Sequence, residues 1–262
     1  KKPITFLFSR SGDTTETVDA LKQISTSKLS KSFGITCNRD SYLYKNSDFS
    51  FSLSEASEKA VVTTKSFTSM ALLPLLIFSS LSEEHGCFKE LKKLPAFGRN
   101  IINKYENISK VLGQNEDINK FSILSNLPNF GLAREVKLKI LEMTLSWADC
   151  FNTLDFRHGP RAVVDRNSLI ILFLSDKAAS YELNLARELK EMGAKLLVFG
   201  DIVPKEFYNL TDDIIEIGEK IGEWLRGILF LPVIHFLAYY KAVKKGLNPD
   251  KPKNLTYFVE IR

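Results

Sequence analysis

Three charged residues in the middle of the chain have the types and the spacing that proton-transfer chemistry requires. Glu135, Lys139 and Glu142 stand at positions i, i+4 and i+7, so on a helix they share one face. A carboxylate can act as the base for a carbon acid, and a fixed ammonium can stabilise the oxyanion that then develops. Spacing alone leaves a second interpretation open, because a Glu–Lys pair at i, i+4 is also a common surface ion pair, worth roughly a few tenths of a kcal/mol.

A histidine follows this predicted helix, sixteen residues after Glu142. His158 stands in the stretch 155–160, which ends in Gly-Pro and lies between a predicted helix and a predicted strand. A single histidine in such a loop is poor core material, but its imidazole can exchange protons near neutral pH. We therefore interpret His158 as a candidate catalytic residue together with Glu142 and Lys139.

A second group of residues, near the amino terminus, has the chemistry of an anion site. The apolar run 4–8 predicts a buried strand, and Val18, Leu21 and Ile24 predict one face of a helix. Between them lies the turn 9–14, with the sequence Ser-Arg-Ser-Gly-Asp-Thr. The first amides of a helix lack intrahelical partners and carry the positive end of its dipole, so this geometry suits an anion. The alternative is an ordinary serine or threonine N-cap.

The type of anion follows from what this turn contains and lacks. Ser9, Ser11 and Thr14 add hydroxyl donors, and Gly12 lets the backbone approach a ligand closely. The turn is not a Walker loop, because no Gly-Lys-Ser/Thr follows, and it lacks the glycine spacing of a dinucleotide fingerprint. The favoured ligand is a phosphate monoester.

Composition narrows the class of protein. The chain has 262 residues, 44% of them hydrophobic, and a formal net charge of +5, which fits an anionic small substrate. No basic run with interleaved aromatic residues favours nucleic acid. Cys37, Cys87 and Cys150 are widely spaced and the histidines are scattered, so we expect no metal, no cofactor and a reducing cytoplasm. The richest apolar segment, 228–240, is too short to span a bilayer, so we expect no membrane contact.

The elements that must position these residues alternate between strand and helix, which predicts an α/β fold. Open sheets of this class bind ligands beyond the carboxyl ends of their strands, where the turn 9–14 is predicted to lie. The predicted strands are 4–8, 33–38, 49–53, 121–124, 168–174, 196–200 and 214–217. The predicted helices end near 27 and 81 and span 83–113, 131–149 and 219–245.

The second half of the sequence repeats a pattern of the first. A hydroxyl, a glutamate and an alanine follow Ser9, and the same residue types follow Ser175 at the same offsets of five, seven and eleven. The matched residues are Thr14, Glu16 and Ala20, and Ser180, Glu182 and Ala186. We predict two domains, 1–115 and 116–262, with the phosphate site in the first, because the second lacks the Ser-x-Ser-Gly turn.

These motifs together resemble one family. The stretch Ser-Arg-Ser-Gly-Asp-Thr-Thr-Glu-Thr at 9–17 resembles the phosphate loop of SIS (sugar isomerase) domains. The helix 135–142 and the Phe-Arg-His-Gly-Pro loop 156–160 resemble the isomerase domain of glucosamine-6-phosphate synthase and the related aminosugar-phosphate deaminases. The segment 58–68 resembles one that borders their sugar pocket. The resemblance implies two SIS domains, each a doubly wound parallel sheet flanked by helices.

The resemblance also implies residue roles. Glu142 would move a proton between C1 and C2 of the open-chain sugar, Lys139 would counter charge on the enediolate, and Glu135 would bind or orient the sugar. His158 would assist ring opening in a neighbouring subunit's site, which implies a homodimer with shared active sites. Ser9, Ser11 and Thr14 would hold the 6-phosphate, and Val61 would line the pocket. Arg10 would be a further substrate-binding residue.

Departures from the family narrow the expected reaction. An earlier strand and loop of the first SIS domain, and a glutaminase domain, are not found in this sequence, and Tyr257 stands where the synthase has a lysine. We therefore expect a deaminating isomerase that converts glucosamine 6-phosphate to fructose 6-phosphate and ammonia. Two alternatives stay open: an aldose–ketose phosphosugar isomerase without nitrogen chemistry, and a non-catalytic phosphosugar-binding regulator.

Overall fold

The computed structural model describes residues 2–81, 85–211 and 213–257. The chain forms two compact units, one of residues 1–84 with 250–262 and one of residues 85–249. The first is called unit 1 and the second unit 2. Each is described by itself.

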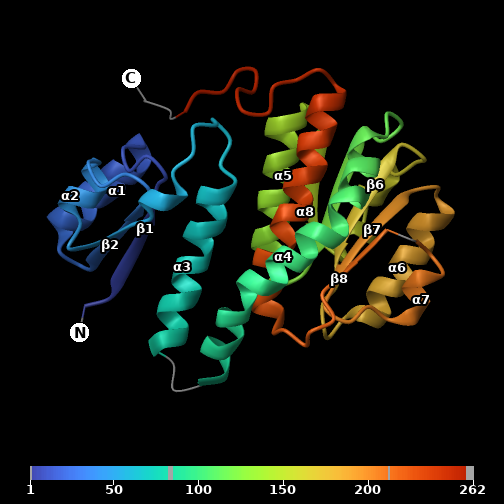
Figure 1. Ribbon diagram of the computed structural model, residues 1–262, viewed down its shortest axis with the longest axis horizontal. Coiled ribbons are helices and arrows are strands. Elements are labelled where there is room, and N and C mark those ends of the chain that lie inside the picture. Colours follow the sequence, from blue (N-terminus) through green and yellow to red (C-terminus); the bar gives the residue numbers. More distant parts are fainter. Residues whose placement is uncertain (1, 82–84, 212, 258–262) are drawn as a thin grey trace. The chain divides into compact units, whose positions relative to one another are not determined.

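Unit 1 contains a parallel sheet of three strands in the order β1-β2-β3. Its strands alternate with helices, as the sequence predicts, and its last long helix is α3 (Figure 1). The elements are β1 (Ile4–Phe8), α1 (Thr15–Ser27), β2 (Lys31–Thr36), α2 (Tyr42–Asn46), β3 (Phe49–Ser52), η1 (Ser54–Ala56) and α3 (Lys65–Leu81).

The two faces of this sheet bury different residues, because successive side chains of a strand point to opposite faces. Leu7 of β1 packs with Leu21 of α1 and Leu43 of α2. Phe6, its neighbour, makes ring contacts with Phe33 of β2 and Phe78 of α3. The turn 9–14 lies between the carboxyl end of β1 and the start of α1.

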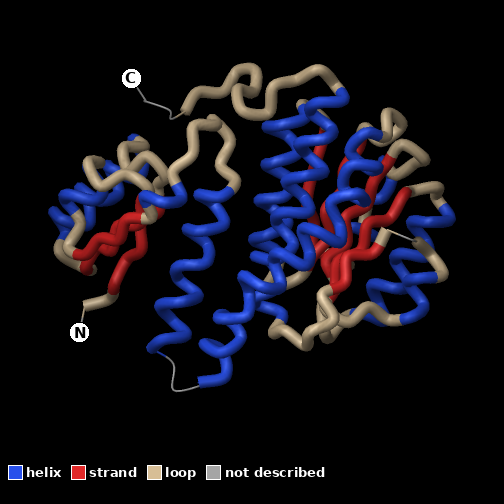
Figure 2. Tube along the Cα trace, viewed as in Figure 1, coloured by secondary structure: helices blue, strands red, loops and turns tan. Residues whose placement is uncertain are grey.

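Unit 2 contains a parallel sheet of five strands in the order β5-β4-β6-β7-β8. Figure 2 shows these strands as a layer with helices on both sides. Its elements are α4 (His85–Gln114), β4 (Lys120–Ser125), α5 (Phe130–Thr144), β5 (Trp147–Asn152), η2 (Asp155–Arg157), η3 (Pro160–Val163), β6 (Ser168–Phe173), α6 (Ala179–Glu191), β7 (Lys195–Gly200), α7 (Lys205–Tyr208), β8 (Ile214–Glu216) and α8 (Glu223–Lys244).

The central strand β6 is buried on both faces, as is usual for a parallel strand covered by helices. On one face Leu172 packs in a cluster with Leu185 of α6 and Phe207 of α7. On the other face Phe173 makes ring contacts with Phe230 of α8. The core of unit 2 therefore consists of two apolar layers, one on each side of the sheet.

The helix predicted over 131–149 is shorter than expected. It ends at Thr144, with Leu145 in the left-handed conformation at φ 50°, and the chain turns into strand β5. The sequence Trp-Ala-Asp-Cys-Phe-Asn at 147–152 lacks a clear alternation of apolar and polar residues, so it does not predict this strand. This correction matters for the site, because α5 packs against β4 and β5 as well as α8 and is therefore held on several sides.

The repeat counted in the sequence coincides with a repeat of topology. The run β1-α1-β2-α2-β3 in unit 1 has the same order of elements as β6-α6-β7-α7-β8 in unit 2, and both runs are parallel. In the described residues, however, only unit 2 also has the strands β4 and β5. The expectation of two SIS domains is therefore not supported: the fold is α/β, with parallel sheets flanked by helices, and one unit is domain-sized.

The division between the units also differs from the boundary expected at residue 115. The helix α4 lies in unit 2, where it packs along α8 (Figure 1). Residues 250–257 belong with unit 1, where the Val61 amide donates a hydrogen bond to the Asp250 carbonyl at 2.8 Å.

One helix among the described residues, α8, is long and apolar enough to cross a membrane by length and composition. Half of that apolar window is buried inside the protein, and the core helix of a water-soluble domain passes the same test. In unit 2, α8 packs against both α4 and α5. The helix α8 is therefore part of the packed core of unit 2.

Candidate active site

The helix α5 brings the three charged residues together, as their spacing predicts. Lys139 Nζ lies 2.5 Å from Glu142 Oε2 and 3.5 Å from Glu135 Oε1. They are not a surface pair: the side chains of Lys139 and Glu135 are 1% and 5% exposed, and that of Glu142 is 21% exposed. Burying charges is costly unless they are paired, so this cluster carries a cost that a surface Glu–Lys pair would not.

Burial perturbs one member of the cluster most. Desolvation raises the pKa of Glu135 to about 7, an effect that the Lys139 charge reduces and the Glu142 charge increases. Its Oε1 atom is buried without a hydrogen-bond partner of good geometry, since the ammonium lies nearer to Glu142. A carboxyl group that changes charge near neutral pH beside a partly exposed carboxylate is a common feature of catalytic sites.

His158 lies on an exposed loop of unit 2, directly after η2. Beside it, Arg157 pairs with Glu188 of α6 at 2.5 Å, which ties the loop to that helix. Within the described residues, no hydrogen bond or ion pair joins His158 to Glu142. The structure therefore brings Glu135, Lys139 and Glu142 together but leaves His158 apart from Glu142 in the single chain.

In unit 1, the hydroxyls of the turn 9–14 converge. Ser9 Oγ lies 2.8 Å from Thr14 Oγ1 and 3.4 Å from Ser11 Oγ, and Ser11 Oγ lies 3.5 Å from Thr14 Oγ1. The Gly12 amide donates to Ser9 Oγ at 3.0 Å. Gly12 has φ +76°, and a Cβ there would fall 2.1 Å from Ser41 Oγ, so only glycine fits this turn.

The arrangement does not match an ordinary helix cap. Thr14 occupies the N-cap position of α1, yet its side chain makes no capping hydrogen bond and faces Ser9 instead. Three hydroxyls gathered in front of a helix N-terminus are the arrangement that an anion site requires. The geometry thus favours the anion interpretation over the N-cap interpretation.

Arg10 points away from these hydroxyls. Its guanidinium donates to the Ala60 carbonyl at 2.8 Å and to the Tyr257 carbonyl at 2.9 Å, and its Cζ lies 3.9 Å from the centre of the Tyr257 ring. The side chain is buried, and both terminal nitrogens of its guanidinium take part in these contacts. Arg10 therefore joins the turn to residues 58–61 and to the C-terminal segment.

Residues 58–66 are held by an internal carboxylate. Glu58 accepts hydrogen bonds from the backbone amides of Thr64 and Ser66 at 2.9 and 3.1 Å and from both hydroxyls. These bonds lower the pKa of Glu58 although its burial opposes them. Val61 is half-buried in this loop.

Sequence reasoning gave no role to Glu182, which the structure singles out. Its fully buried carboxylate accepts from the Ser175 amide at 3.0 Å and from Asn126 Nδ2 at 3.0 Å. Desolvation raises its pKa to about 7. At the carboxyl end of β6, the first backbone amide of the turn, that of Ser175, is thus already bonded to the Glu182 side chain. The repeat offset from Ser175 was the only signal in the sequence.

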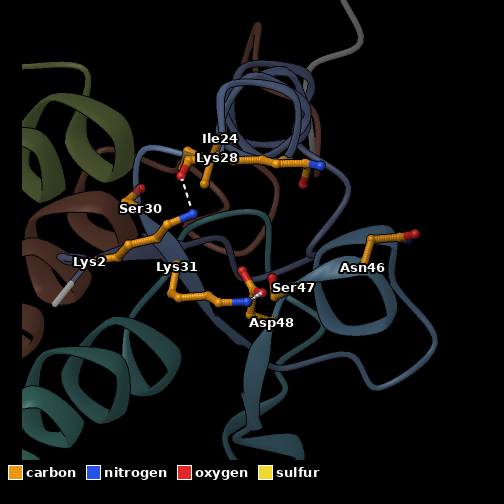
Figure 3. A pocket seen from close by; sticks show the side chains of 9 residues that line it. Lys2, Ile24, Lys28, Ser30, Lys31, Asn46, Ser47 and Asp48 are labelled. Atoms are coloured by element: carbon orange, nitrogen blue, oxygen red, sulfur yellow. Dashed lines mark hydrogen bonds and ion pairs between the residues drawn. The ribbon is translucent and has the colours of Figure 1, made fainter.

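Two cavities of unit 1 lie at opposite ends of its sheet. One of about 400 Å³ lies beyond the carboxyl ends of β2 and β3, lined by Arg39, residues 51–56, Lys65 and Ser69. The other, of about 310 Å³, lies at the amino ends (Figure 3). There Lys2 donates to the Lys28 carbonyl and Lys31 pairs with Asp48, so these ammonium groups are already engaged.

No group of three or more histidine, cysteine, aspartate or glutamate side chains in the described part of the chain could hold a metal ion. Asp48 and Asp165, for example, are each bonded to a lysine and to a backbone amide.

Several known proteins are similar to this chain in sequence and in fold. No family model matches the chain. It is 28% identical over 274 residues to the glutamine–fructose-6-phosphate aminotransferase (isomerizing) of Buchnera aphidicola, an alignment that covers 100% of this chain and 44% of that protein. The chain therefore spans less than half of the length of this curated relative.

Two solved structures extend the comparison. The glucosamine-6-phosphate deaminase of Thermotoga maritima is 26% identical, with a TM-score of 0.77 over 98% of this chain and 75% of that chain. The chain is homologous to SIS isomerase domains. The tagatose-6-phosphate ketose/aldose isomerase of Escherichia coli, 24% identical, shares the fold, with a TM-score of 0.83 over 99% of this chain and 72% of that chain.

Proposed function

We propose that the protein is a phosphosugar isomerase that deaminates an amino-hexose 6-phosphate, converting glucosamine 6-phosphate to fructose 6-phosphate and ammonia. One relative is named as an aminotransferase of fructose 6-phosphate and another as a deaminase of glucosamine 6-phosphate, and these names support the proposal. In this proposal the turn 9–14 of unit 1 is the phosphate-binding element, and α5 of unit 2 carries the base. No cofactor takes part, and the cytoplasm is the proposed location.

The observation that carries the proposal is the position of Glu142. It is the member of the α5 cluster that reaches solvent, and the Lys139 ammonium is fixed directly behind it at 2.5 Å. Glu142 takes the proton from C2 of the open-chain aldose and returns it to C1 through an enediol(amine) intermediate. The resulting C2 ketimine adds water and releases ammonia, while the fixed ammonium opposes the negative charge that develops on the sugar.

The other residues have supporting roles in this proposal. Ser9, Ser11 and Thr14 bind the 6-phosphate through their hydroxyls. Arg10 and Val61 shape the substrate pocket. Arg10 does so by joining neighbouring segments, because its guanidinium is bonded to the Ala60 and Tyr257 carbonyls. His158 acts on the sugar oxygens of a neighbouring subunit in a homodimer, which agrees with its exposed position.

The test is solvent exchange at C2 of glucosamine 6-phosphate in deuterium oxide, together with ammonia release. Glu142→Gln keeps the shape of the side chain and removes its basicity, so exchange should fall by about 10² to 10⁴ with little change in binding. The matched control is Glu116→Gln, which also removes a carboxylate paired with a lysine, 2.7 Å from Lys244, but on an exposed surface. Normal exchange in Glu142→Gln would contradict the mechanism.

A second candidate is plain aldose–ketose isomerisation, favoured by the likeness of fold to the Escherichia coli ketose/aldose isomerase. It needs the same base and no nitrogen chemistry. Assays with glucosamine, galactosamine and fructose 6-phosphates separate the candidates: hydrogen exchange without ammonia supports isomerisation alone. Binding of phosphosugars without any exchange would support the regulator instead.

A further inference from the structure

The three charged residues of α5 differ in how deeply they are buried, and this difference indicates a role for Glu135. Glu142 is the outermost of the three, Lys139 lies directly behind it, and Glu135 is buried beside Lys139. The lysine has one ammonium for two carboxylates and lies closer to Glu142, by 2.5 Å against 3.5 Å. A buried Glu135 is poorly placed to contact a sugar, so its influence on chemistry has to pass through Lys139.

The charge of the cluster changes with the state of Glu135. Burial raises the pKa of this carboxyl to about 7, so it is neutral in mildly acidic solution and ionised above neutrality. With Glu135 neutral, the ion pair of Lys139 and Glu142 has no net charge. With Glu135 ionised, two carboxylates compete for one ammonium, and the three groups together carry a net negative charge.

The other charged groups on the elements packed against α5 are mostly bonded elsewhere. On β4, Lys120 pairs with Asp165, and on β5, Asp149 pairs with Lys137. On α8, Arg226 pairs with Asp176, Lys241 donates to the Asn115 carbonyl, Lys244 pairs with Glu116, and Glu223 accepts from the Asp176 amide. Directly after α8, Lys245 donates to the Thr144 carbonyl. The helix α8 also carries the half-buried His235, and an unperturbed histidine has a pKa near neutrality, so this residue needs its own control.

We propose that Glu135 is a positioning residue that sets the basicity of Glu142 through their shared lysine, Lys139. In this proposal, ionised Glu135 competes with Glu142 for the ammonium and so makes Glu142 a stronger base, and neutral Glu135 does not. The inference rests on the proposed role of Glu142 as the base. It adds to that role a built-in dependence on pH, with the chemical step accelerating as the solution passes from mildly acidic to mildly basic.

The substitution Glu135→Gln tests this, because glutamine matches the neutral form of the residue. In C2 exchange assays, variant and wild type should agree within about twofold at low pH, and above neutrality the variant should be about three- to tenfold slower in kcat, with a smaller change in KM. Glu135→Asp, which keeps a titratable group, should retain the rise. A Glu135→Gln profile displaced by the same factor at every pH would mean a merely structural role and would overturn the proposal.

His235→Asn is the control for the other titrating group. Its pH profile should keep the rise seen in the wild type, since the rise is assigned to Glu135. Loss of the rise in His235→Asn, together with its survival in Glu135→Gln, would transfer the effect to the histidine and contradict the proposal.

A measurement without substrate keeps this inference separate from the proposed function. In the carboxyl ¹³C NMR spectrum of the full chain, the Glu142 resonance of the wild type should shift as the solution passes through pH of about 7. That shift should vanish in Glu135→Gln, and its persistence there would overturn the inference. If no phosphosugar is turned over but this titration behaves as expected, the proposed function fails and the coupling within the cluster stands.

Discussion

At the level of single residues, Glu182 allows the effect of a buried carboxyl group on the pH dependence of stability to be tested. Its pKa is raised from 4.5 to about 7 by burial, so the folded state binds a proton more tightly than the unfolded state does. The stabilisation from that proton is fully present below pH of about 4.5 and is lost as the pH rises through about 7. At higher pH the buried charge costs up to about 3 kcal/mol.

The substitution Glu182→Gln should remove this dependence. Its amide oxygen can still accept from the Ser175 amide, and Asn126 can turn its own oxygen toward the new NH₂ group. In urea unfolding, the variant should gain stability relative to the wild type between pH 5 and pH 8, by about 1–3 kcal/mol. Glu191→Gln, an exposed position on the same helix α6, should show no such gain. A Glu182→Gln effect that is equal at both pH values would show that the carboxyl does not titrate in this range.

At the scale of elements, the turn between β1 and α1 and the turn between β6 and α6 have the same topological place but different contents. The first gathers three hydroxyls, and the second gives its Ser175 amide to Glu182. An anion already supplied by the protein occupies the hydrogen-bond donor that a phosphate would need. This difference is the physical reason to expect phosphate binding at the first turn and not at the second.

The substitutions Ser11→Ala and Thr14→Ala should each weaken binding of glucosamine 6-phosphate. A hydrogen bond to a charged group contributes about 1.5–3 kcal/mol, so the Kd from calorimetry should rise roughly tenfold or more. The matched control is Ser180→Ala, at the offset from Ser175 that corresponds to Thr14. Equal losses at both turns would rule out a single phosphate site.

At the scale of the whole molecule, assembly is the open prediction. His158 is exposed on its loop and, in the described residues, makes no bond with Glu142, so a shared site needs the histidine of a second copy. Mixing inactive Glu142→Gln chains with inactive His158→Ala chains should restore part of the activity, because some hybrid sites then contain both intact groups. Subunit exchange is checked first by mass spectrometry of the mixture. Confirmed exchange with no recovered activity would count against shared sites.

Features that depend on neighbouring residues along the chain could be predicted from the sequence alone. The strand, glycine turn and helix around Gly12 follow from an apolar run, a residue that tolerates positive φ, and helical periodicity. The shared face of Glu135, Lys139 and Glu142 follows from the helical repeat alone. The parallel α/β class follows from the alternation of strands and helices.

The burial of these residues and their long-range contacts follow from the tertiary structure and not from the sequence pattern. The spacing of Glu135 and Lys139 is equally compatible with a solvated surface, and it is the packing of α5 against α8, β4 and β5 that removes them from water. The same holds for Arg10, whose partners lie 50 and 247 residues away along the chain. Desolvation and long-range contacts depend on the whole fold, so a charge's exposure, its pKa and its partner cannot be obtained from spacing along the sequence.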